Sequence, residues 1–130
     1  MPHLPYLVTL LALAVLFGTA VAVGRGRVKY KIAAPATTGH PDFERLFRIQ
    51  MNTLEQLALF LPALWVAAHY VKPEIAGGIG LLWIAGRIWY AIAYAADAGK
   101  RGPGFGMGML STGVLWAIGA WYATAGLVQG

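Results

Sequence analysis

The chain has 130 residues, of which 58% are hydrophobic and 12% are charged, so its apolar content exceeds that of an ordinary soluble fold. It contains no cysteine, which excludes disulfide bonds, thiolate metal sites and a cysteine nucleophile. The net charge is +5, and in a membrane protein such basic residues report orientation rather than nucleic-acid binding. We therefore predict an integral membrane protein without a nucleic-acid partner.

Four apolar runs follow one another, each long enough for a helix that crosses a bilayer core of ~30 Å. They predict helices near residues 4–24, 43–71, 75–97 and 107–127. No Lys or Arg precedes the first run, which is also too long for the apolar part of a signal peptide, so we expect this helix to be retained. The predicted fold class is an all-α four-transmembrane-helix bundle that forms one domain, residues 1–130.

Basic residues gather in the first and third connectors. The segment RGRVKYK follows the first run, and Lys100 and Arg101 follow the third, whereas the second connector has only Lys72. The positive-inside rule then puts both termini on the non-cytoplasmic side. Prolines and a glycine interrupt the first connector, and Asp42 is expected to cap the second helix.

Polar side chains follow one face of each central helix. At about 100° per residue, an arc of about 80° of the second helix holds four of them: Arg45, Arg48, Asn52 and Glu55. The third helix repeats nearly the same spacing with Arg87, Tyr90, Tyr94 and Asp97. An ionisable group in hydrocarbon costs about 2.5 kcal/mol or more, so these stripes should face each other, a neighbouring subunit or a wet cavity.

The polar pattern alone allows two interpretations. In the first, Glu55 neutralises Arg87 or Arg48 and Asn52 binds a backbone carbonyl, so that the stripes only join helices. In the second, the excess of arginine over carboxylate binds a small polyanion, because guanidinium groups bind carboxylates in pairs of hydrogen bonds. Both interpretations leave open whether Asp97 forms an ion pair with Lys100 or with Arg101.

Glycine and tryptophan residues carry structural expectations. We expect close helix approach at Gly77, Gly80, Gly86, Gly113 and Gly119. The tryptophans are expected to be interfacial anchors or packing residues. The stretch GPGFGMG makes the approach to the fourth helix rich in glycine and raises the question of where Arg101 lies.

The stretch FERLFRIQMNTLEQLALFLPALW, with PATTGHPD before it and GRIWYAIAYAADAGKR in the third helix, resembles the MAPEG family, the membrane-associated proteins in eicosanoid and glutathione metabolism. Within that family, the chain looks like a bacterial-type microsomal glutathione transferase-like member. The resemblance implies a homotrimer in the bacterial inner membrane. It also implies glutathione as cosubstrate, bound between adjacent subunits toward the cytoplasm.

The resemblance also assigns site residues. Those implied to bind glutathione are Arg27 from a neighbouring subunit, Arg48, Gln50, Asn52, Glu55, Arg87, Tyr90 and Tyr94. Arg101 is similar to the arginine that stabilises the glutathione thiolate and is the expected catalytic residue. Gln56 and Gly102 differ from the leukotriene- and prostaglandin-synthesising branches, so neither specialised activity is implied.

The function implied is that of a glutathione transferase, which activates the thiolate for attack on a lipophilic second substrate, with glutathione-dependent reduction of lipid hydroperoxides as a possible companion activity. The alternative is a noncatalytic trimeric scaffold or lipid-binding protein that retains the glutathione pocket. A small drug exporter is disfavoured because residues 4–24 contain no acidic residue. His3, His40 and His69 lack the spacing of metal ligands, so no metal is expected.

Overall fold

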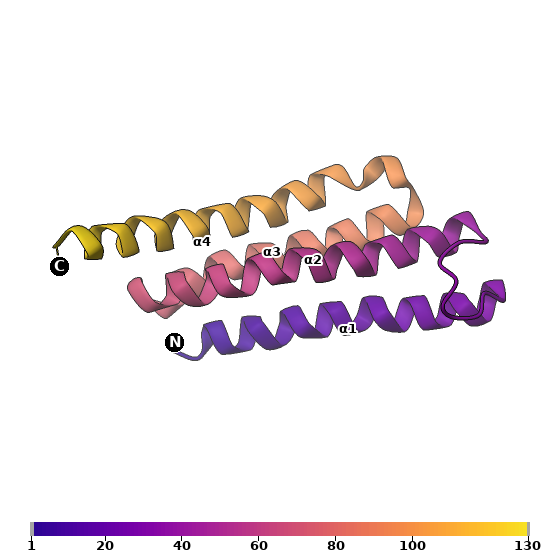
Figure 1. Ribbon diagram of the computed structural model, residues 1–130, viewed down its shortest axis with the longest axis horizontal. Helices are drawn as coiled ribbons and strands as arrows, with labels where there is room; N and C mark the ends of the chain where they lie inside the picture. Colours follow the sequence, from indigo (N-terminus) through magenta and orange to yellow (C-terminus); the bar gives the residue numbers. More distant parts are fainter. Residues whose placement is uncertain (1, 130) are drawn as a thin grey trace.

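Four long helices make up the computed structural model, which describes residues 2–129 (Figure 1). They are α1 (Leu4–Tyr30), α2 (Pro41–Tyr70), α3 (Pro73–Ala96) and α4 (Gly102–Gln129), and the short 3₁₀ helix η1 (Ala98–Lys100) precedes α4. The described residues form no strand. The prediction of an all-α fold with four long helices is therefore confirmed.

Two predicted helix boundaries were wrong. α1 does not end near residue 24 but continues to Tyr30, because Arg and Lys favour helix and their charges suit its C-terminal end. Lys31, in the left-handed conformation with φ 57°, then ends it. α4 begins at Gly102 rather than near residue 107, since Pro103 is compatible with the first turn of a helix.

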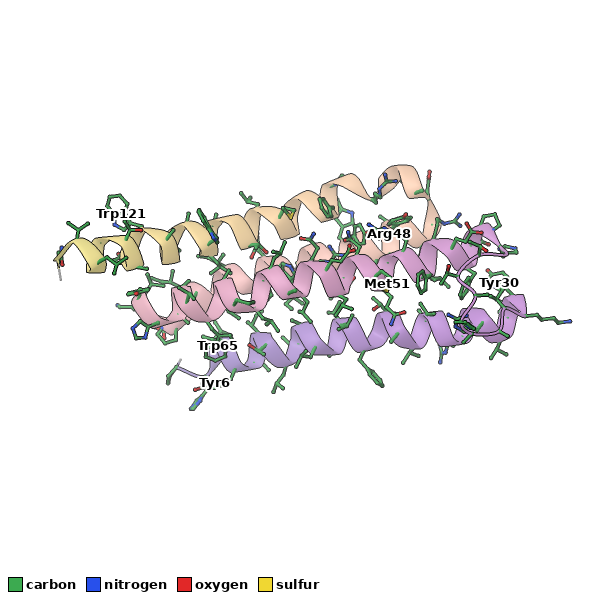
Figure 2. The ribbon with its side chains drawn as sticks, viewed as in Figure 1. Tyr6, Tyr30, Arg48, Met51, Trp65 and Trp121 are labelled. Carbon is green, nitrogen blue, oxygen red and sulfur yellow. The ribbon has the colours of Figure 1, made fainter. Side chains whose placement is uncertain are left out.

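α2 and α3 form the centre of the bundle. α1 packs against both of them on one side, and α4 packs against both on the other (Figure 1). The core between the helices includes Phe60 and Trp83, which are fully buried and stack with their ring centroids 4.5 Å apart. Large apolar side chains also cover the outside, as Trp121 does at the far end of α4 (Figure 2). An outer surface of this kind suits contact with lipid.

The 31–40 connector and η1 lie at one end of the bundle, which we call the connector end, and the start of α1 and the end of α4 lie at the other (Figure 1). Among the described residues, α1 and α3 meet the criteria of length and apolar composition for crossing a membrane. α2 and α4, which were also predicted to cross the membrane, do not meet these criteria, because α2 is interrupted by polar residues and α4 is rich in small residues. Because the first and third connectors both lie at the connector end, their basic residues gather at that end of the bundle.

α3 and α4 approach each other closely through glycine. A Cβ atom added to Gly86 would lie 2.8 Å from the backbone nitrogen of Gly108, and one added to Gly104 would lie 2.8 Å from the carbonyl oxygen of Gly86. Close approach is also confirmed for Gly77, Gly80 and Gly119. The prediction of close approach was wrong for Gly113, where an added Cβ would meet nothing within 4 Å. The glycine-rich start of α4 is thus a packing surface rather than a loose linker.

Gly104→Ala should destabilise the protein, because the new methyl group would meet the backbone of α3, which cannot rotate away. Overpacking of this kind costs about 1–3 kcal/mol. Gly106→Ala is the matched control, since a Cβ at Gly106 has open space and alanine favours helix by up to ~1 kcal/mol over glycine. Thermal unfolding in detergent, followed by circular dichroism, should give a lower Tm for Gly104→Ala only. Equal Tm values for the two variants would contradict the close contact.

Candidate functional site

A cavity of about 270 Å³ lies near the connector end between α2, α3 and α4. Five of the predicted site residues line it: Arg48, Asn52, Tyr90, Tyr94 and Arg101. Gly102 and Phe105 complete the lining and were not predicted, because nothing in their spacing distinguishes them from other residues of a glycine-rich helix. We call this space the arginine cavity.

Helical spacing brings the lining residues together. Arg48 and Asn52 are four residues apart on α2, as are Tyr90 and Tyr94 on α3, so each pair shares one face of its helix. The two tyrosine rings meet edge to face with centroids 5.5 Å apart. Figure 2 shows Arg48 on α2 near the connector end. Two of the four residues in each predicted polar stripe therefore line the cavity, and the other two do not.

Arg101 is oriented by the short turn that precedes it. Its Nη1 donates a hydrogen bond to the carbonyl oxygen of Ala98 at 2.8 Å, and its guanidinium carbon lies 5.4 Å from the centroid of the Tyr94 ring. Asp97 instead caps η1, accepting a hydrogen bond from the backbone N–H of Gly99 at 2.9 Å. No carboxylate of residues 2–129 forms an ion pair with Arg101, so its charge is not neutralised within the described chain.

Arg48 has a counter-ion of its own. Its Nη2 lies 3.6 Å from Oε1 of Glu55, and both side chains are 54% exposed. An exposed pair of this kind contributes little, about 0–1 kcal/mol. A carboxylate that enters the arginine cavity can therefore compete with Glu55 for Arg48.

Arg87 lies behind the cavity rather than in its lining. It is 1% exposed, and its Nη2 donates to Oδ1 of Asn52 at 2.8 Å and to Oγ1 of Thr53 at 3.1 Å. Its guanidinium carbon lies 4.1 Å from the centroid of the Tyr90 ring. The sequence left open whether Glu55 pairs with Arg87 or with Arg48, and the structure pairs it with Arg48. Asn52 was expected to bind a backbone carbonyl, but its side-chain oxygen accepts a hydrogen bond from Arg87 instead.

Thr53 is a member of this network that the sequence analysis missed. Its hydroxyl accepts from Arg87 and donates to the carbonyl oxygen of Ile49 at 2.7 Å. It is buried between Asn52 and the core. A threonine within a helix is too common to be recognised as a partner of a buried arginine, so no sequence signal could have identified it.

Arg27 and Gln50 do not line the arginine cavity of their own chain. The Nη1 of Arg27 donates to the carbonyl oxygens of Ala36 at 2.7 Å and Ile32 at 3.4 Å, which holds the 31–40 connector against α1. Its Nε and Nη2 donate no hydrogen bond within residues 2–129. Gln50 is two residues from both Arg48 and Asn52, so it lies on the opposite side of α2.

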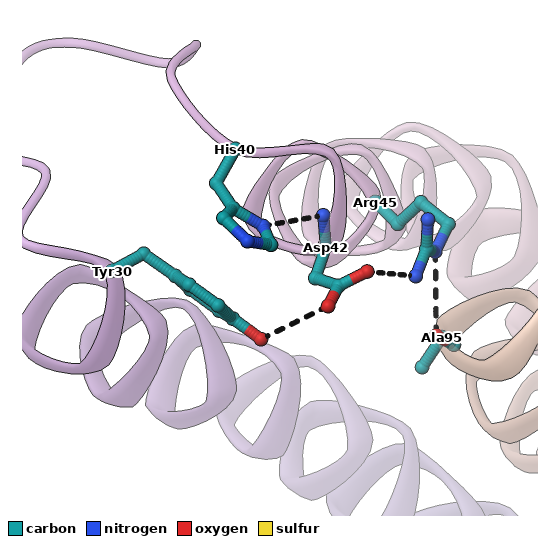
Figure 3. Close-up of polar contacts among 5 residues, drawn as sticks. All are labelled: Tyr30, His40, Asp42, Arg45 and Ala95. Atoms are coloured by element: carbon teal, nitrogen blue, oxygen red, sulfur yellow. Dashed lines mark hydrogen bonds and ion pairs between the residues drawn. The ribbon is translucent and has the colours of Figure 1, made fainter.

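Arg45 also points away from the cavity. It pairs with the carboxylate of Asp42, and its Nε donates to the carbonyl oxygen of Ala95 at 3.3 Å (Figure 3). Tyr30 donates to the same carboxylate at 3.3 Å, so α1, α2 and α3 are joined at this point. Asp42 precedes the predicted second span, and its hydrogen bond with Arg45 lowers its pKa.

His40, not Asp42, caps α2, which corrects the prediction. Its Nδ1 accepts a hydrogen bond from the backbone N–H of Asp42 at 3.1 Å (Figure 3). The helix begins at Pro41, which is well suited to the first helical position because it has no N–H to leave unpaired. Asp42 then lies inside the first turn. Within residues 2–129, no group of three or more His, Asp and Glu side chains is placed to hold a metal ion.

The fold and the cavity together define an α-helical bundle of the membrane-protein class with an arginine-lined site near one end. Residues 5–121 match the MAPEG family. The chain therefore belongs to the MAPEG family, whose members are membrane-associated, and this confirms the resemblance found in the sequence.

Similar proteins come from bacteria and mammals. The chain is 50% identical to an uncharacterized protein of Synechocystis sp. over 116 residues, which cover 89% of this chain and 84% of that protein. It is 41% identical to microsomal glutathione S-transferase 2 of Homo sapiens over 101 residues, or 78% of this chain and 69% of the relative. It is 38% identical to leukotriene C4 synthase of Cavia porcellus over 94 residues, or 72% of this chain and 63% of the relative.

Thr53→Val should destabilise the protein, because it removes one of the two acceptors of the buried Arg87 charge. Loss of a hydrogen bond to a charged group costs about 1.5–3 kcal/mol. Thr112→Val is the control, since the Thr112 hydroxyl is buried without a hydrogen-bond partner among the described residues, and its removal should be neutral or stabilising. Denaturant or thermal unfolding of the two variants would measure the difference. If both lost the same stability, the proposed support of Arg87 by Thr53 would be wrong.

Proposed function

We propose that the chain is a membrane-bound glutathione transferase. The relatives named for glutathione S-transferase activity cover most of this chain, and the family is shared over residues 5–121. The observation that carries the proposal is Arg101, a guanidinium without a carboxylate partner among the described residues, which lines a cavity with Arg48 and two tyrosines. Such a site favours an anion.

Arg101 would act by stabilising the thiolate of glutathione. A thiol has a reference pKa of about 8.5, and lowering it by ~2 units requires ~2.7 kcal/mol of selective stabilisation of the anion. One guanidinium ~4 Å from the sulfur supplies up to about 4 kcal/mol at an effective dielectric constant near 20, before desolvation is subtracted. A guanidinium stays protonated, so Arg101 is a stabiliser and water takes the proton. The Tyr94 hydroxyl is suited to a second hydrogen bond to the sulfur.

The remaining polar residues would hold the two ends of the tripeptide. Arginine binds carboxylates with two parallel hydrogen bonds, which suits Arg48. Glu55, released from Arg48, matches the ammonium group, and Asn52 matches an amide of the glutathione backbone. These groups lie around one cavity or next to it.

A homotrimer accounts for Arg27 and Gln50. Both lie away from the arginine cavity of their own chain, so they contribute to a glutathione site only if that site is shared by two copies. Arg27 is suited to this role, because its connector bonds use Nη1 alone and leave Nε and Nη2 to donate. We therefore infer glutathione sites between adjacent subunits of a trimer.

The position of the cavity supports a site that faces the cytoplasm. It lies near the connector end, where the basic residues of the first and third connectors gather, and the positive-inside rule assigns that end to the cytoplasm. Both termini would then be on the opposite side. The cyanobacterial relative is consistent with a bacterial inner membrane.

The second substrate would be a lipophilic electrophile that enters from the bilayer. The outer faces of α1 and α4 present large apolar side chains such as Phe17 and Trp116, between which such a molecule could lie in neighbouring subunits. The thiolate sulfur forms the new bond to the electrophilic carbon, and the leaving group or the electron pair of a double bond takes up the negative charge. A thiolate in the same place would also suit the reduction of a lipid hydroperoxide.

The ultraviolet thiolate signal on adding glutathione at neutral pH tests the role of Arg101. We expect the signal in the purified protein and its loss, by tenfold or more, in Arg101→Ala with glutathione still bound. Arg48→Ala should instead weaken binding. Lys100→Ala is the matched control, because it removes an equal charge from the adjacent exposed residue and should leave the signal intact.

The same measurement separates the competing functions. Binding without a thiolate in the unaltered protein would favour the noncatalytic scaffold that retains a glutathione pocket. Absence of binding would refute glutathione as the ligand. A signal that Lys100→Ala abolishes as fully as Arg101→Ala would show a diffuse charge effect rather than a stabilising contact.

The affinity for glutathione should depend on pH in a defined direction. A thiol with a pKa lowered by ~2 units from ~8.5 is ionised in the complex but not in free solution between about pH 6.5 and 8.5. Protons are therefore released on binding, and affinity should rise with pH across this window and level off above it. Calorimetric titration in Arg101→Ala should give a flat profile. A rise of equal slope in the variant would contradict the thiolate role.

A further inference from the structure

A second, mostly apolar groove runs along the opposite side of the bundle from α4. Its first part, of about 310 Å³, lies between α1 and α3, with Leu46 and Ile49 of α2 among its lining residues. Its other part, of about 280 Å³, shares Gly18, Ala22 and Leu46 with the first and extends toward the end of α1. The two parts are therefore continuous, and we call them together the α1 groove. It shares no lining residue with the arginine cavity.

Two basic residues bound the α1 groove toward the connector end. Arg25 and Lys29 both line its second part and are exposed. They are four residues apart, so they lie on one face of α1. The groove is thus apolar along the helix and positively charged where α1 approaches its end.

The charges of Arg25 and Lys29 are not neutralised within residues 2–129. Neither forms an ion pair, and the ammonium group of Lys29 lies 5.3 Å from the centroid of the Tyr30 ring. The carboxylate that Tyr30 contacts belongs to Asp42, which is already paired with Arg45. An anion between the two basic side chains would have no competing carboxylate from this cluster.

We propose that the α1 groove binds one anionic phospholipid. Its acyl chain would lie in the apolar part between α1 and α3, and its phosphate would lie between Arg25 and Lys29. From Val15 to Arg25 the helix rises about 15 Å, so the groove has its apolar part at depth and its charges toward the membrane surface. A zwitterionic lipid fits the apolar part equally well but gains less from two unneutralised cations. This inference does not depend on the proposed transferase activity.

The groove offers a variant that fills it without disturbing the helix. An added Cβ at Gly18 would meet no atom within 4 Å, and Gly18 lines both parts of the groove. Gly18→Leu should therefore block the acyl chain while leaving both charges in place. Ala91→Leu, from the α3 wall of the same groove, serves as a second blocking variant if Gly18→Leu lowers the Tm.

Lipid retention by the purified trimer or monomer, measured by native mass spectrometry, tests the proposal. Detergent micelles would contain palmitoyl-oleoyl phosphatidylglycerol or the matching phosphatidylcholine. We expect preferential retention of phosphatidylglycerol, about fivefold weaker in Arg25→Gln and in Lys29→Gln, the factor for ~1 kcal/mol per basic residue near an anionic surface. Gly18→Leu should abolish retention. Lys31→Gln, an exposed lysine outside the groove, should have no effect.

Several results would overturn the proposal. They are equal retention of the two lipids, a loss in Lys31→Gln as large as in Arg25→Gln, or undiminished retention in both groove-blocking variants. Full competition by soluble glycerol phosphate would mean that the site binds a phosphate without an acyl chain, which also refutes it. Glutathione binding, measured in parallel, should be unchanged in Gly18→Leu and in Arg25→Gln, because the arginine cavity lies elsewhere.

Discussion

Helices α3 and α4 meet backbone to backbone at Gly86 and Gly104, and the arginine cavity depends on this contact. Any side chain on Gly104 would meet the backbone of Gly86 and Tyr90 in α3. Because α4 begins only one residue after Arg101, its close docking brings that guanidinium to the end of α3, beside Tyr94. The glycine-rich segment, which left the place of Arg101 open in the sequence, therefore positions this residue in the cavity.

The buried charge of Arg87 connects this contact to the second helix. Two neutral oxygen atoms on α2 accept its hydrogen bonds, and the Tyr90 ring covers its face. A charge buried without a carboxylate is costly unless it is hydrogen-bonded, and because Nε of Arg87 has no partner among the described residues, its two Nη2 bonds to α2 carry this role. The network thus resists rotation of α2 against α3, and it holds Asn52 and Tyr90 in the cavity wall. Arg87 shapes the site from behind, although the sequence suggested that it would line it.

Much of the fold was predictable because a bilayer limits the choices to long apolar helices. Helical spacing also fixed which polar side chains share a face of α2 and of α3, but only two residues of each face line the cavity. The end of α1 was not, because the basic segment after residue 24 is compatible with either helix or connector. Arg45 was misplaced for a different reason. It lies on the predicted polar arc, but its long side chain reaches Asp42 and the end of α3 instead, and no helical wheel gives that direction.

The exposed pair of Arg48 and Glu55 has a consequence for ligand discrimination. A dianion that binds Arg48 breaks its ion pair with Glu55 and leaves the Glu55 carboxylate unpaired, close to the negative charge of the ligand. A zwitterionic ligand replaces this ion pair with two others, because its carboxylate pairs with Arg48 and its ammonium group pairs with Glu55. In the proposed complex, this exchange would favour a ligand with a carboxylate and an ammonium group over a dianion, by a small margin because the exposed pair contributes only about 0–1 kcal/mol.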